Sequence, residues 1–595
     1  MKIAEIQITN FRGIKKAKFF LDGNTVLIGD NNSGKSTILE AIDLVLGPDR
    51  LSRVSIIDEH DFYGGAYLDD DHEHPKISVV LVIIGLSEEQ TRRFSAHLEF
   101  WNQSSREFID DPARTSDASV VPAIRVAFEG KYDVDDDDFI GETFFLHPQN
   151  QDGTYSSFKK EDKRKCGFLY LRTIRTGTRA LSLERGSLLD MILKLQDKQL
   201  KMWENVLENL RGVPVAQDDE LGINDTLQQV QSMMYELVPN EWADNPNIKV
   251  SNLTREDLRK TLSVFLSTGV QTSNGQTHSA PFQHQGTGTT NMLVLALLSM
   301  IADLKNSVIF AMEEPEIAIP PHTQKRLVER ICQKSAQVIF TSHSPYILEE
   351  FPPKNLLRIN RQDGMLTGKP CEYPPTVKPK TYREEMKRRF CEALLARRVL
   401  IAEGQTERDA WPAAAKRLHE INPSDYDTFS NLGIAIINAE TDTQIAALSE
   451  FFNDLGIQVF AVYDKQTNPV NTAKINHANM IRYESSEKGF ENVILNGTPE
   501  QTLRDYGQQL IDKDEWTPNL PSPDFAQSTF EDVKKKLLEF WKNKKGEGSI
   551  ADCLGEYRTE NEFPAFIRDT LKNIRSHVAQ SGHVIAPVAP NEEQE

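Results

Sequence analysis

The sequence predicts an α/β protein of two domains, and three features of the 595-residue chain lead to that expectation. Residues 1–46 alternate strand-like segments with turns and end in a Gly-rich loop followed by an amphipathic helix. Residues 307–350 show the order strand, loop, helix, strand, loop. A Pro-rich stretch at 372–382 indicates a linker, and a fresh α/β unit follows it. We therefore expect a first domain at 1–380 and a second at 392–595.

Composition limits the classes of function. No apolar run reaches the ~18 residues needed to span a membrane, and the N-terminus lacks the apolar block of a signal peptide. Five scattered cysteines with no CxxC pair favour a reducing cytoplasm. A net charge of −20 argues against coating nucleic acid through bulk electrostatics, although local basic patches or bound metal ions could still hold phosphates.

The first domain continues with apolar runs at 77–86 and 120–128, which we expect to be strands. Acidic runs at 69–74 and 133–139 lie next to them. These runs are typical of solvated loops, with metal binding as the alternative.

A helical insertion is expected at 186–267, after a strand-like segment at 168–175, because Leu, Ile and Met recur there at three- and four-residue spacing. The insertion is either a self-association element or an ordinary helical layer. Residues 271–289 are polar and Gly-rich and are expected to form a loop, and a long helix is expected at 289–304.

A phosphate-binding loop is predicted at residues 29–36, where the spacing GxxxxGK followed by Ser lies between an apolar strand and a helix. Backbone N–H groups and the helix N-terminus would cradle phosphate. Lys35 would reach the β- and γ-phosphates, and the Ser36 hydroxyl would ligate Mg²⁺. The expected ATP-binding residues of this loop are Gly29, Asn32, Gly34, Lys35, Ser36 and Thr37.

Two later strand ends complete the expected ATPase site. Glu313 ends an apolar run and would hold the Mg²⁺ shell, while Glu314 would orient or activate the attacking water. His343, in the segment VIFTSHSP, would contact the γ-phosphate. A glycine loop containing Gly286 and Gly288 precedes the long helix and occupies the position of a signature loop, or is a plain glycine loop.

Together with NFRGI at 10–14, these motifs resemble the RecF/SMC-like branch of ABC ATPases. The resemblance implies an N-terminal ABC-type domain whose ATP lies between two heads, and therefore a homodimer or a higher homo-oligomer. The chain departs from the family at Ile319-Pro320-Pro321, where a Leu-His-Pro element is common.

The second domain carries acids at its predicted strand ends. Glu403 ends the apolar run 399–402, and Glu407 follows four residues later, so both carboxylates could face one divalent ion. A later strand ends in Asp464, and Glu487 and Glu491 again lie four apart. Such acids would converge at the carboxyl edge of a parallel sheet and would repel one another unless they held metal.

This pattern resembles a Toprim domain, and an SMC-like ATPase followed by Toprim resembles the OLD (overcoming lysogenization defect) family of nucleases, which includes the Gabija nuclease subunit. The resemblance implies a DNA endonuclease under ATP control that depends on Mg²⁺ or Mn²⁺ and serves against phage or other foreign DNA. A two-metal mechanism is implied, in which one ion activates water and the other stabilises the leaving oxygen.

The family's site residues carry over position by position. Glu403 and Glu407 match the EGxxE metal pair, and Asp464 matches the first acid of a DxD whose second position is Gln466 here. Glu487 and Glu491 match the later acidic cluster. The expected catalytic lysine is Lys544 or Lys545, and a solvated helix end is the alternative for either.

Several points stay open at the level of sequence. The rival reading is a DNA-responsive ATPase clamp with a degenerate Toprim domain that acts through a partner, for instance a helicase-like or other defence protein. A topoisomerase or primase is disfavoured because little room remains for a strand-passage domain. DNA contact would be local, through the basic segments 159–165, 387–389 or 534–545. The sign of the nucleotide effect is not determined.

Overall fold

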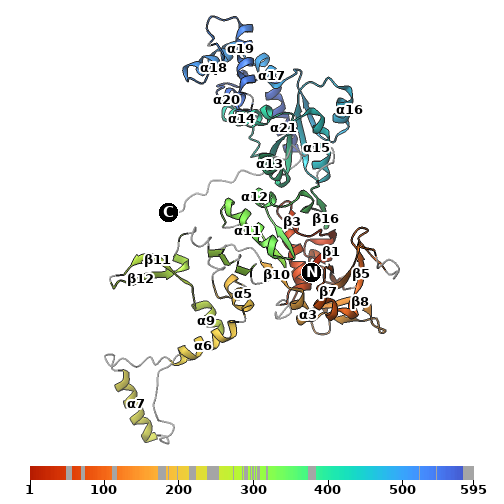
Figure 1. The fold of residues 1–595 in the computed structure, drawn as a ribbon, viewed down its shortest axis with the longest axis vertical. Helices are drawn as coiled ribbons and strands as arrows, with labels where there is room; N and C mark the ends of the chain where they lie inside the picture. The colour runs from red at the N-terminus through yellow and green to blue at the C-terminus, as the bar shows by residue number, and fades with distance from the viewer. Residues whose placement is uncertain are drawn as a thin grey trace. The chain divides into compact units, whose positions relative to one another are not determined.

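The computed structural model describes the chain except for residues 49–55, 69–73, 110–116, 172–181, 185–186, 197, 213–222, 238–253, 273, 285, 287–292, 295, 298–299, 302, 304–307, 317–318, 373–383, 522, 545 and 581–595. The chain divides into two compact units, and many of their elements are labelled in Figure 1. The first unit comprises Met1–Gly13, Phe20–Thr25 and Ser36–Ser342, and the second comprises Ile14–Phe19, Val26–Lys35 and His343–Glu595.

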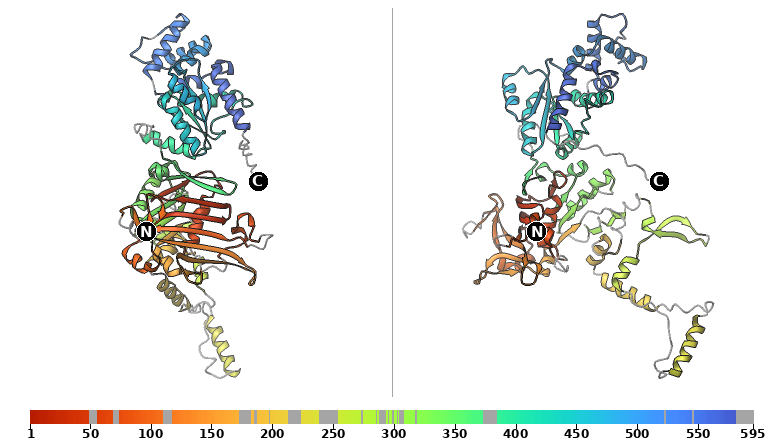
Figure 2. Two further views of the ribbon diagram at one scale, coloured as in Figure 1. Left: turned by 90° about the vertical axis from the view of Figure 1, so that its right-hand side faces the viewer. Right: turned by 180° about the vertical axis from the view of Figure 1, so that it is seen from behind.

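Long antiparallel strands form one part of the first unit. The central stretches of β1, β4 and β7 are mostly buried, and exposed or half-buried residues recur toward their ends. The strands run side by side in red to orange in Figure 2. The pairing order is β1 (Lys2–Phe11), β4 (Ile77–Ile84), β7 (Val120–Asp133) and β8 (Asp138–Gln149), with β5 (Glu99–Asn102) also on β7. The strands expected at 77–86 and 120–128 are confirmed.

A parallel layer forms a second part of the same unit. Strands β10 (Phe168–Leu171), β13 (Ile309–Glu313) and β14 (Gln337–Thr341) pair in parallel. All five residues of β14 and the first four of β13 are buried, which is typical of parallel strands covered on both faces. Helix α11 (Pro321–Lys334) connects β13 to β14, so the order expected for 307–350 is confirmed.

The insertion is helical, as expected, over α5 (Leu188–Leu195), α6 (Gln199–Gly212), α7 (Ile223–Leu237) and α9 (Arg255–Thr261). Its end was predicted wrongly. Residues assigned to helix and loop form a hairpin of β11 (Phe265–Gln271) and β12 (Thr277–Pro281). Most side chains of this hairpin are exposed, so the sequence carries no alternation of apolar and polar residues that would mark strands. The helix expected at 289–304 lies largely outside the described residues.

The second unit contains the strand that feeds the phosphate loop. Helix α1 (Lys35–Leu46) follows that loop. Strand β3 (Thr25–Ile28) pairs in parallel with β15 (Leu356–Gln362), which forms a hairpin with β16 (Met365–Pro370). β16 also pairs in parallel with β2 (Ile14–Phe20). The hairpin turn is Asp363-Gly364, and both residues have positive φ, as a two-residue turn of this kind requires.

The second unit also contains the C-terminal α/β fold. Its sheet has the order β18 (Ile434–Asn438), β17 (Arg398–Ala402), β19 (Gln458–Tyr463), β20 (Ile481–Glu484), and every pair is parallel. The helices are α13 (Glu384–Leu395), α14 (Gln405–Ile421), α15 (Asp442–Asp454), α16 (Pro469–His477), α17 (Phe490–Gly497), α18 (Glu500–Asp512), α19 (Phe530–Asn543), α20 (Ser549–Gly555) and α21 (Ala565–Gln580). One apolar core joins β17 and β19 to α14 and the C-terminal helices, with Trp411 and Trp541 fully buried in it. The new α/β unit expected after the Pro-rich stretch is thereby confirmed.

Among the described residues, the search for a helix long and apolar enough to cross a membrane found none. The five cysteines form no disulfide, as their spacing suggested.

Candidate metal centre and nucleotide loop

The phosphate loop has a backbone that only glycine can supply at two positions. Gly29 has a φ of 146°, and a Cβ there would lie 2.5 Å from the carbonyl oxygen of Ile359. Gly34 has a φ of 101°, and its Cβ would press on Leu366. The loop therefore runs close against β15 and β16 and leaves its main chain free of side-chain bulk.

Lys35 closes the loop on itself. Its ammonium donates to the carbonyl oxygens of Gly29 (2.9 Å) and Asp30 (2.8 Å), and the residue is only 7% exposed. Ser33 places a buried Oγ there with no hydrogen-bond partner. Asn32, at a positive φ of 66°, and Ser36 are exposed, so the Ser36 hydroxyl is accessible. A tight main chain, a lysine and an unsatisfied hydroxyl suit a phosphate group.

The two acids at the end of β13 belong to the first unit. Glu313 pairs in register with Thr341 of β14, and the Tyr170 hydroxyl donates to its Oε1. Glu314 has a φ of 44°, a left-handed conformation that a non-glycine residue adopts at a cost, and its N–H donates to the Thr341 carbonyl at 2.9 Å. Strand β13 therefore ends just before Glu314.

The departure from the family at residues 319–321 has a local explanation. Pro320 is the N-cap of α11 and Pro321 is its first residue, a position where the missing N–H of proline costs nothing. The Gln324 side chain donates to the Ile319 carbonyl at 2.9 Å. Prolines thus start the helix that returns the chain to β14.

Three of the four remaining predicted nucleotide-site residues lie in the described part of the chain. His343 lies two residues after β14 and belongs to the second unit with the P-loop. Thr37 is half-buried in the first turn of α1. Gly286 is exposed, and Gly288 lies outside the described residues.

Glu403 and Asp464 lie at the carboxyl ends of two adjacent parallel strands. Ala402 of β17 is opposite Val462 of β19 in the register. The Asp464 N–H donates to Glu403 Oε2 at 2.9 Å, and Asp464 Oδ2 accepts from the Gly489 N–H at 2.8 Å. Main-chain donors thus hold one oxygen of each carboxylate, which leaves the other oxygen of each for a ligand.

The carboxylates interact electrostatically. Burial raises the pKa of Glu407 to about 7, and the charges of Asp464, Glu403 and Glu491 act in the same direction. Burial also raises the pKa of Glu403, to which the charges of Asp464 and Asp442 contribute. The pKa of Asp464 is raised by burial and by Glu491. Desolvated acids that share a repulsive field mark functional sites more often than structural ones.

The four predicted acids that repel one another lie at four elements. Glu403 follows β17, and Glu407 lies 7% exposed in the first turn of α14. Asp464 follows β19, and Glu491 lies in the first turn of α17. Glu487 is half-buried, and its main-chain carbonyl accepts from the Lys465 N–H at 3.0 Å. Its charge is not among those that shift the pKa values of Glu403, Glu407 and Asp464.

Gln466, which stands where a second aspartate is expected, forms hydrogen bonds within its own loop. Gln466 accepts from the Asn471 side chain at 2.8 Å and donates through its own amide to the Asp464 carbonyl at 3.1 Å. The Gln466 N–H donates to Glu484 at the end of β20. Its side chain therefore stabilises the loop.

Two polar residues at the end of β18 were missed by sequence reasoning. Asn438 is opposite Ala402 in the register, and its buried Oδ1 has no hydrogen-bond partner. Asp442 begins α15, and its charge reaches Glu403. The signal was present in the sequence, because the run GIAIIN ends in asparagine where the neighbouring strands end in acids.

The donor set suits a hard divalent cation in chemistry. Carboxylate and amide oxygens are the ligands that Mg²⁺ and Mn²⁺ prefer, and a cation would offset the repulsion among the acids and satisfy Asn438. Within the described part of the chain, however, no three His, Cys, Asp or Glu side chains stand close enough to enclose an ion.

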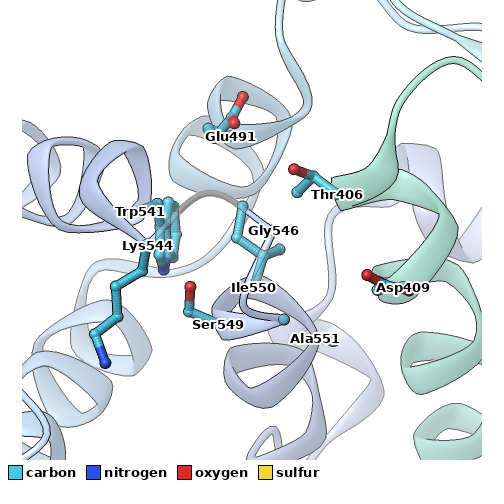
Figure 3. Close-up of a pocket in the computed structure, with 10 residues that line it drawn as sticks. Thr406, Asp409, Glu491, Trp541, Lys544, Gly546, Ser549, Ile550 and Ala551 are labelled. Carbon is cyan, nitrogen blue, oxygen red and sulfur yellow. The ribbon is translucent and has the colours of Figure 1, made fainter. Parts of the chain in front are cut away.

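Lys544 lies near this cluster but is directed away from it. It lines a small pocket together with Glu491, Thr406 and Trp541, and Figure 3 shows its ammonium turned away from Glu491. The Lys544 ammonium lies 3.6 Å from Glu547. Lys545 lies outside the described residues.

The basic segments are less available than their sequence suggests. Lys163 is fully buried and donates to the Leu44 carbonyl, while Lys165 donates to Glu89. Lys387 and Arg388 both donate to Glu349. In the described part of 534–545, three lysines lie near acids, and Lys535 and Lys542 are exposed.

Comparison with known proteins gives two matches to family descriptions. Residues 25–349 match the family described as "AAA domain, putative AbiEii toxin, Type IV TA system". Residues 394–465 match the TOPRIM domain described as overcoming lysogenization defect protein-like.

Three curated relatives align over most of the chain. The Old nuclease of Escherichia phage P2 is 24% identical over 78% of this chain and 77% of its own length. The OLD nuclease of Thermus scotoductus is 22% identical over 79% and 83%. The endonuclease GajA of Bacillus cereus is 21% identical over 96% and 91%.

Proposed function

Because the chain belongs to that AAA-domain family and carries an OLD-like Toprim domain, we propose that it is a metal-dependent DNA endonuclease controlled by ATP. The observation that carries the proposal is the cluster of desolvated carboxylates at the carboxyl edge of the Toprim sheet. The names of three relatives that span at least three quarters of the chain agree with it.

The residues that would hold the metal are Glu403, Glu407, Asp464 and Glu491, with Asn438 and Asp442 as added donors and Glu487 as a further acid of the same edge. Bound Mg²⁺ or Mn²⁺ supplies an activated water and stabilises the charge that develops on the leaving oxygen. The main-chain bonds of Glu403 and Asp464 orient their carboxylates. Lys544, after its side chain turns toward Glu491, or else Lys545 would approach the scissile phosphate.

The nucleotide loop would bind ATP with Mg²⁺. Lys35 would exchange its two loop carbonyls for phosphate oxygens, and Ser36 with Glu313 would hold the ion. Glu314 would orient the attacking water, and His343 would contact the γ-phosphate. Gly286 and Gly288 would serve the nucleotide of a second copy, so the active protein would be a homodimer or larger.

We further propose a role against phage or other foreign DNA; the relatives include a nuclease of Escherichia phage P2. We propose that the protein acts in the cytoplasm. A helicase-like or other defence protein is the partner that we propose.

The test compares Glu403→Gln with Glu450→Gln, an exposed glutamate of α15 in the same domain. Supercoiled plasmid is incubated with Mg²⁺ or Mn²⁺, with and without ATP. Glu403→Gln is expected to lower cleavage by about a hundredfold or more, because a neutral amide replaces a metal-binding charge. Glu450→Gln is expected to cleave like the wild type. Absence of cleavage by the wild-type protein under all these conditions would contradict the proposal.

The second candidate is a DNA-responsive ATPase clamp with a degenerate Toprim domain. It is favoured by Gln466, whose side chain is bound within its loop, and by the lack of an enclosed set of three acids in the described residues. This candidate predicts ATP hydrolysis that DNA stimulates, with no cleavage and no effect of Glu403→Gln.

A further inference from the structure

A buried arginine lies directly behind the phosphate loop. Arg358 of β15 is 3% exposed and stands opposite Ile28, the last residue before Gly29. The next residue, Ile359, has its carbonyl oxygen 2.5 Å from where a Gly29 Cβ would lie. The loop and β15 are therefore in contact along their main chains, so one cannot shift without displacing the other.

The Arg358 guanidinium binds main-chain carbonyls of the Toprim domain. Its Nε donates to the Leu455 carbonyl at 3.0 Å, and its Nη1 donates to the Leu394 carbonyl. Asn360, on the same side of β15, also donates to Leu455, at 2.9 Å. Leu394 lies in the last turn of α13, and Leu455 is the C-cap of α15. A cation at two helix C-termini is stabilised by both helix dipoles.

These two helices flank the strand that leads to the carboxylate cluster. α13 runs into β17, which ends next to Glu403. α15 begins with Asp442, whose charge reaches Glu403. Arg397, just before β17, lies 3.9 Å from Asp30 of the phosphate loop. Burial lowers the pKa of Arg358, and the charge of Asp30 acts in the opposite direction.

We propose that Arg358 is a positioning residue that couples the phosphate loop to the carboxylate cluster, so that binding of a nucleoside triphosphate changes the placement of Glu403 and Asp442. The trigger is Lys35, which must release the carbonyls of Gly29 and Asp30 when it takes up a phosphate. The released main chain presses on Ile359, and Arg358 transmits the shift to α13 and α15. The effect on DNA cleavage rests on the proposed function, whereas the mechanical coupling does not.

The experiment uses the full chain and two readouts. Hydrogen exchange of residues 398–403 and 442–455 is measured with and without a non-hydrolysable ATP analogue, and plasmid cleavage is measured under the same conditions. The variants are Arg358→Lys and Asn360→Ala, and the control is Arg361→Ala, an exposed arginine of the same strand. Binding of a fluorescent ATP analogue is measured for each.

In the wild type and in Arg361→Ala, nucleotide is expected to change exchange in both segments. In Arg358→Lys and Asn360→Ala, that response is expected to fall about threefold or more, while nucleotide affinity stays within about twofold. Folded variants that keep the wild-type response, or a wild type with no response in these segments, would overturn the coupling. If Arg358→Lys does not fold, the hydrogen-exchange response of Asn360→Ala tests the coupling. A hydrogen-exchange response that depends on Arg358 and Asn360, without any plasmid cleavage, would contradict the proposed nuclease function but support the coupling.

Discussion

At the scale of single residues, Glu313 shows how a side chain longer than the usual aspartate is kept in place. The Tyr170 hydroxyl from the neighbouring strand β10 donates to its Oε1. The extra methylene of glutamate adds a side-chain torsion. The hydrogen bond from Tyr170 restricts that torsion and so fixes the carboxylate. Tyr170 is therefore expected to matter for the Mg²⁺-dependent ATPase although it carries no charge.

Tyr170→Phe is expected to raise the Mg²⁺ concentration needed for half-maximal ATP hydrolysis by about tenfold, because the carboxylate loses its orienting donor. The measurement is the ATPase rate against Mg²⁺ concentration, together with the melting temperature. Tyr155→Phe, in a β-strand of the same unit, serves as the control. An unchanged Mg²⁺ dependence in a folded Tyr170→Phe protein would show that Tyr170 does not orient Glu313.

A second residue-scale feature is the ion pair of Glu560 with Lys572. Glu560 accepts from the Tyr426 hydroxyl at 2.6 Å and lies 2.9 Å from the Lys572 ammonium. These hydrogen bonds lower the pKa of Glu560 to about 2. A carboxylate whose folded-state pKa is depressed stabilises the protein above its unfolded pKa, roughly 4.3, and this contribution is lost as the pH falls toward 2.

Tyr426→Phe is expected to lower the free energy of unfolding by about 1 kcal/mol at pH 7, through loss of one hydrogen bond to a charged group. The deficit should narrow below about pH 4, where the wild type also loses its advantage. Melting temperatures at pH 7, 5 and 3.5 measure it. Tyr483→Phe is the matched control, because the buried Tyr483 hydroxyl has no hydrogen-bond partner. A deficit that does not depend on pH would contradict the assignment to Glu560.

At the scale of elements, α7 (labelled in Figure 1) carries an apolar stripe that includes strongly exposed side chains. Leu227, Val230, Met234 and Leu237 recur at the three- and four-residue spacing of a coiled-coil seam. Val230 is 42% exposed and Leu237 is 82% exposed. A stripe of this kind matches itself across a two-fold axis, so we expect it to pair with the same helix of a second copy.

Val230→Asp is expected to lower the mass of the oligomer in solution, since a charge placed in the seam is buried without a partner. Light scattering coupled to size-exclusion chromatography measures the mass. The control is Val134→Asp, an equally small change at a 57%-exposed valine in the turn between β7 and β8. Equal masses for the two variants would place the self-association elsewhere.

At the scale of the whole molecule, the net charge of −20 leads us to expect that a bound metal ion contributes to DNA binding as well as to cleavage. Without a cation, the carboxylates at the Toprim edge would repel a phosphate group. Removing divalent ions with EDTA is therefore expected to abolish cleavage and to weaken DNA binding by about tenfold or more. Fluorescence anisotropy of a labelled duplex measures the binding.

Neutralising two carboxylates of the Toprim edge separates the effect of metal on DNA binding from its effect on cleavage. Glu403→Gln with Asp464→Asn is expected to bind DNA with a smaller dependence on Mg²⁺ than the wild type while remaining inactive. Binding that responds to EDTA equally in both proteins would mean that the metal acts on DNA binding at another place.

Local patterns of the sequence were sufficient for the fold class and for placing the candidate acids at one edge of the Toprim sheet. The glycine spacing of the phosphate loop reflects main-chain sterics, which act within a few residues, and Gly29 and Gly34 adopt the backbone that the motif implies. Acids at the ends of apolar runs predicted the carboxylate cluster, because parallel strands bring their carboxyl ends to one edge of the sheet. The hairpin β11–β12 escaped prediction because its exposed strands show no alternation.

What only the tertiary structure decided is which groups meet. The sequence by itself determined that acids would end β17 and β19, but Asn438 and Asp442 join them through the pairing of β18 with β17. Tyr170 reaches Glu313 across 143 positions of the chain, and Arg358 reaches Leu455 across 97. Burial and strand register bring such groups together. Both arise from packing over the whole fold, so no short stretch of sequence encodes them.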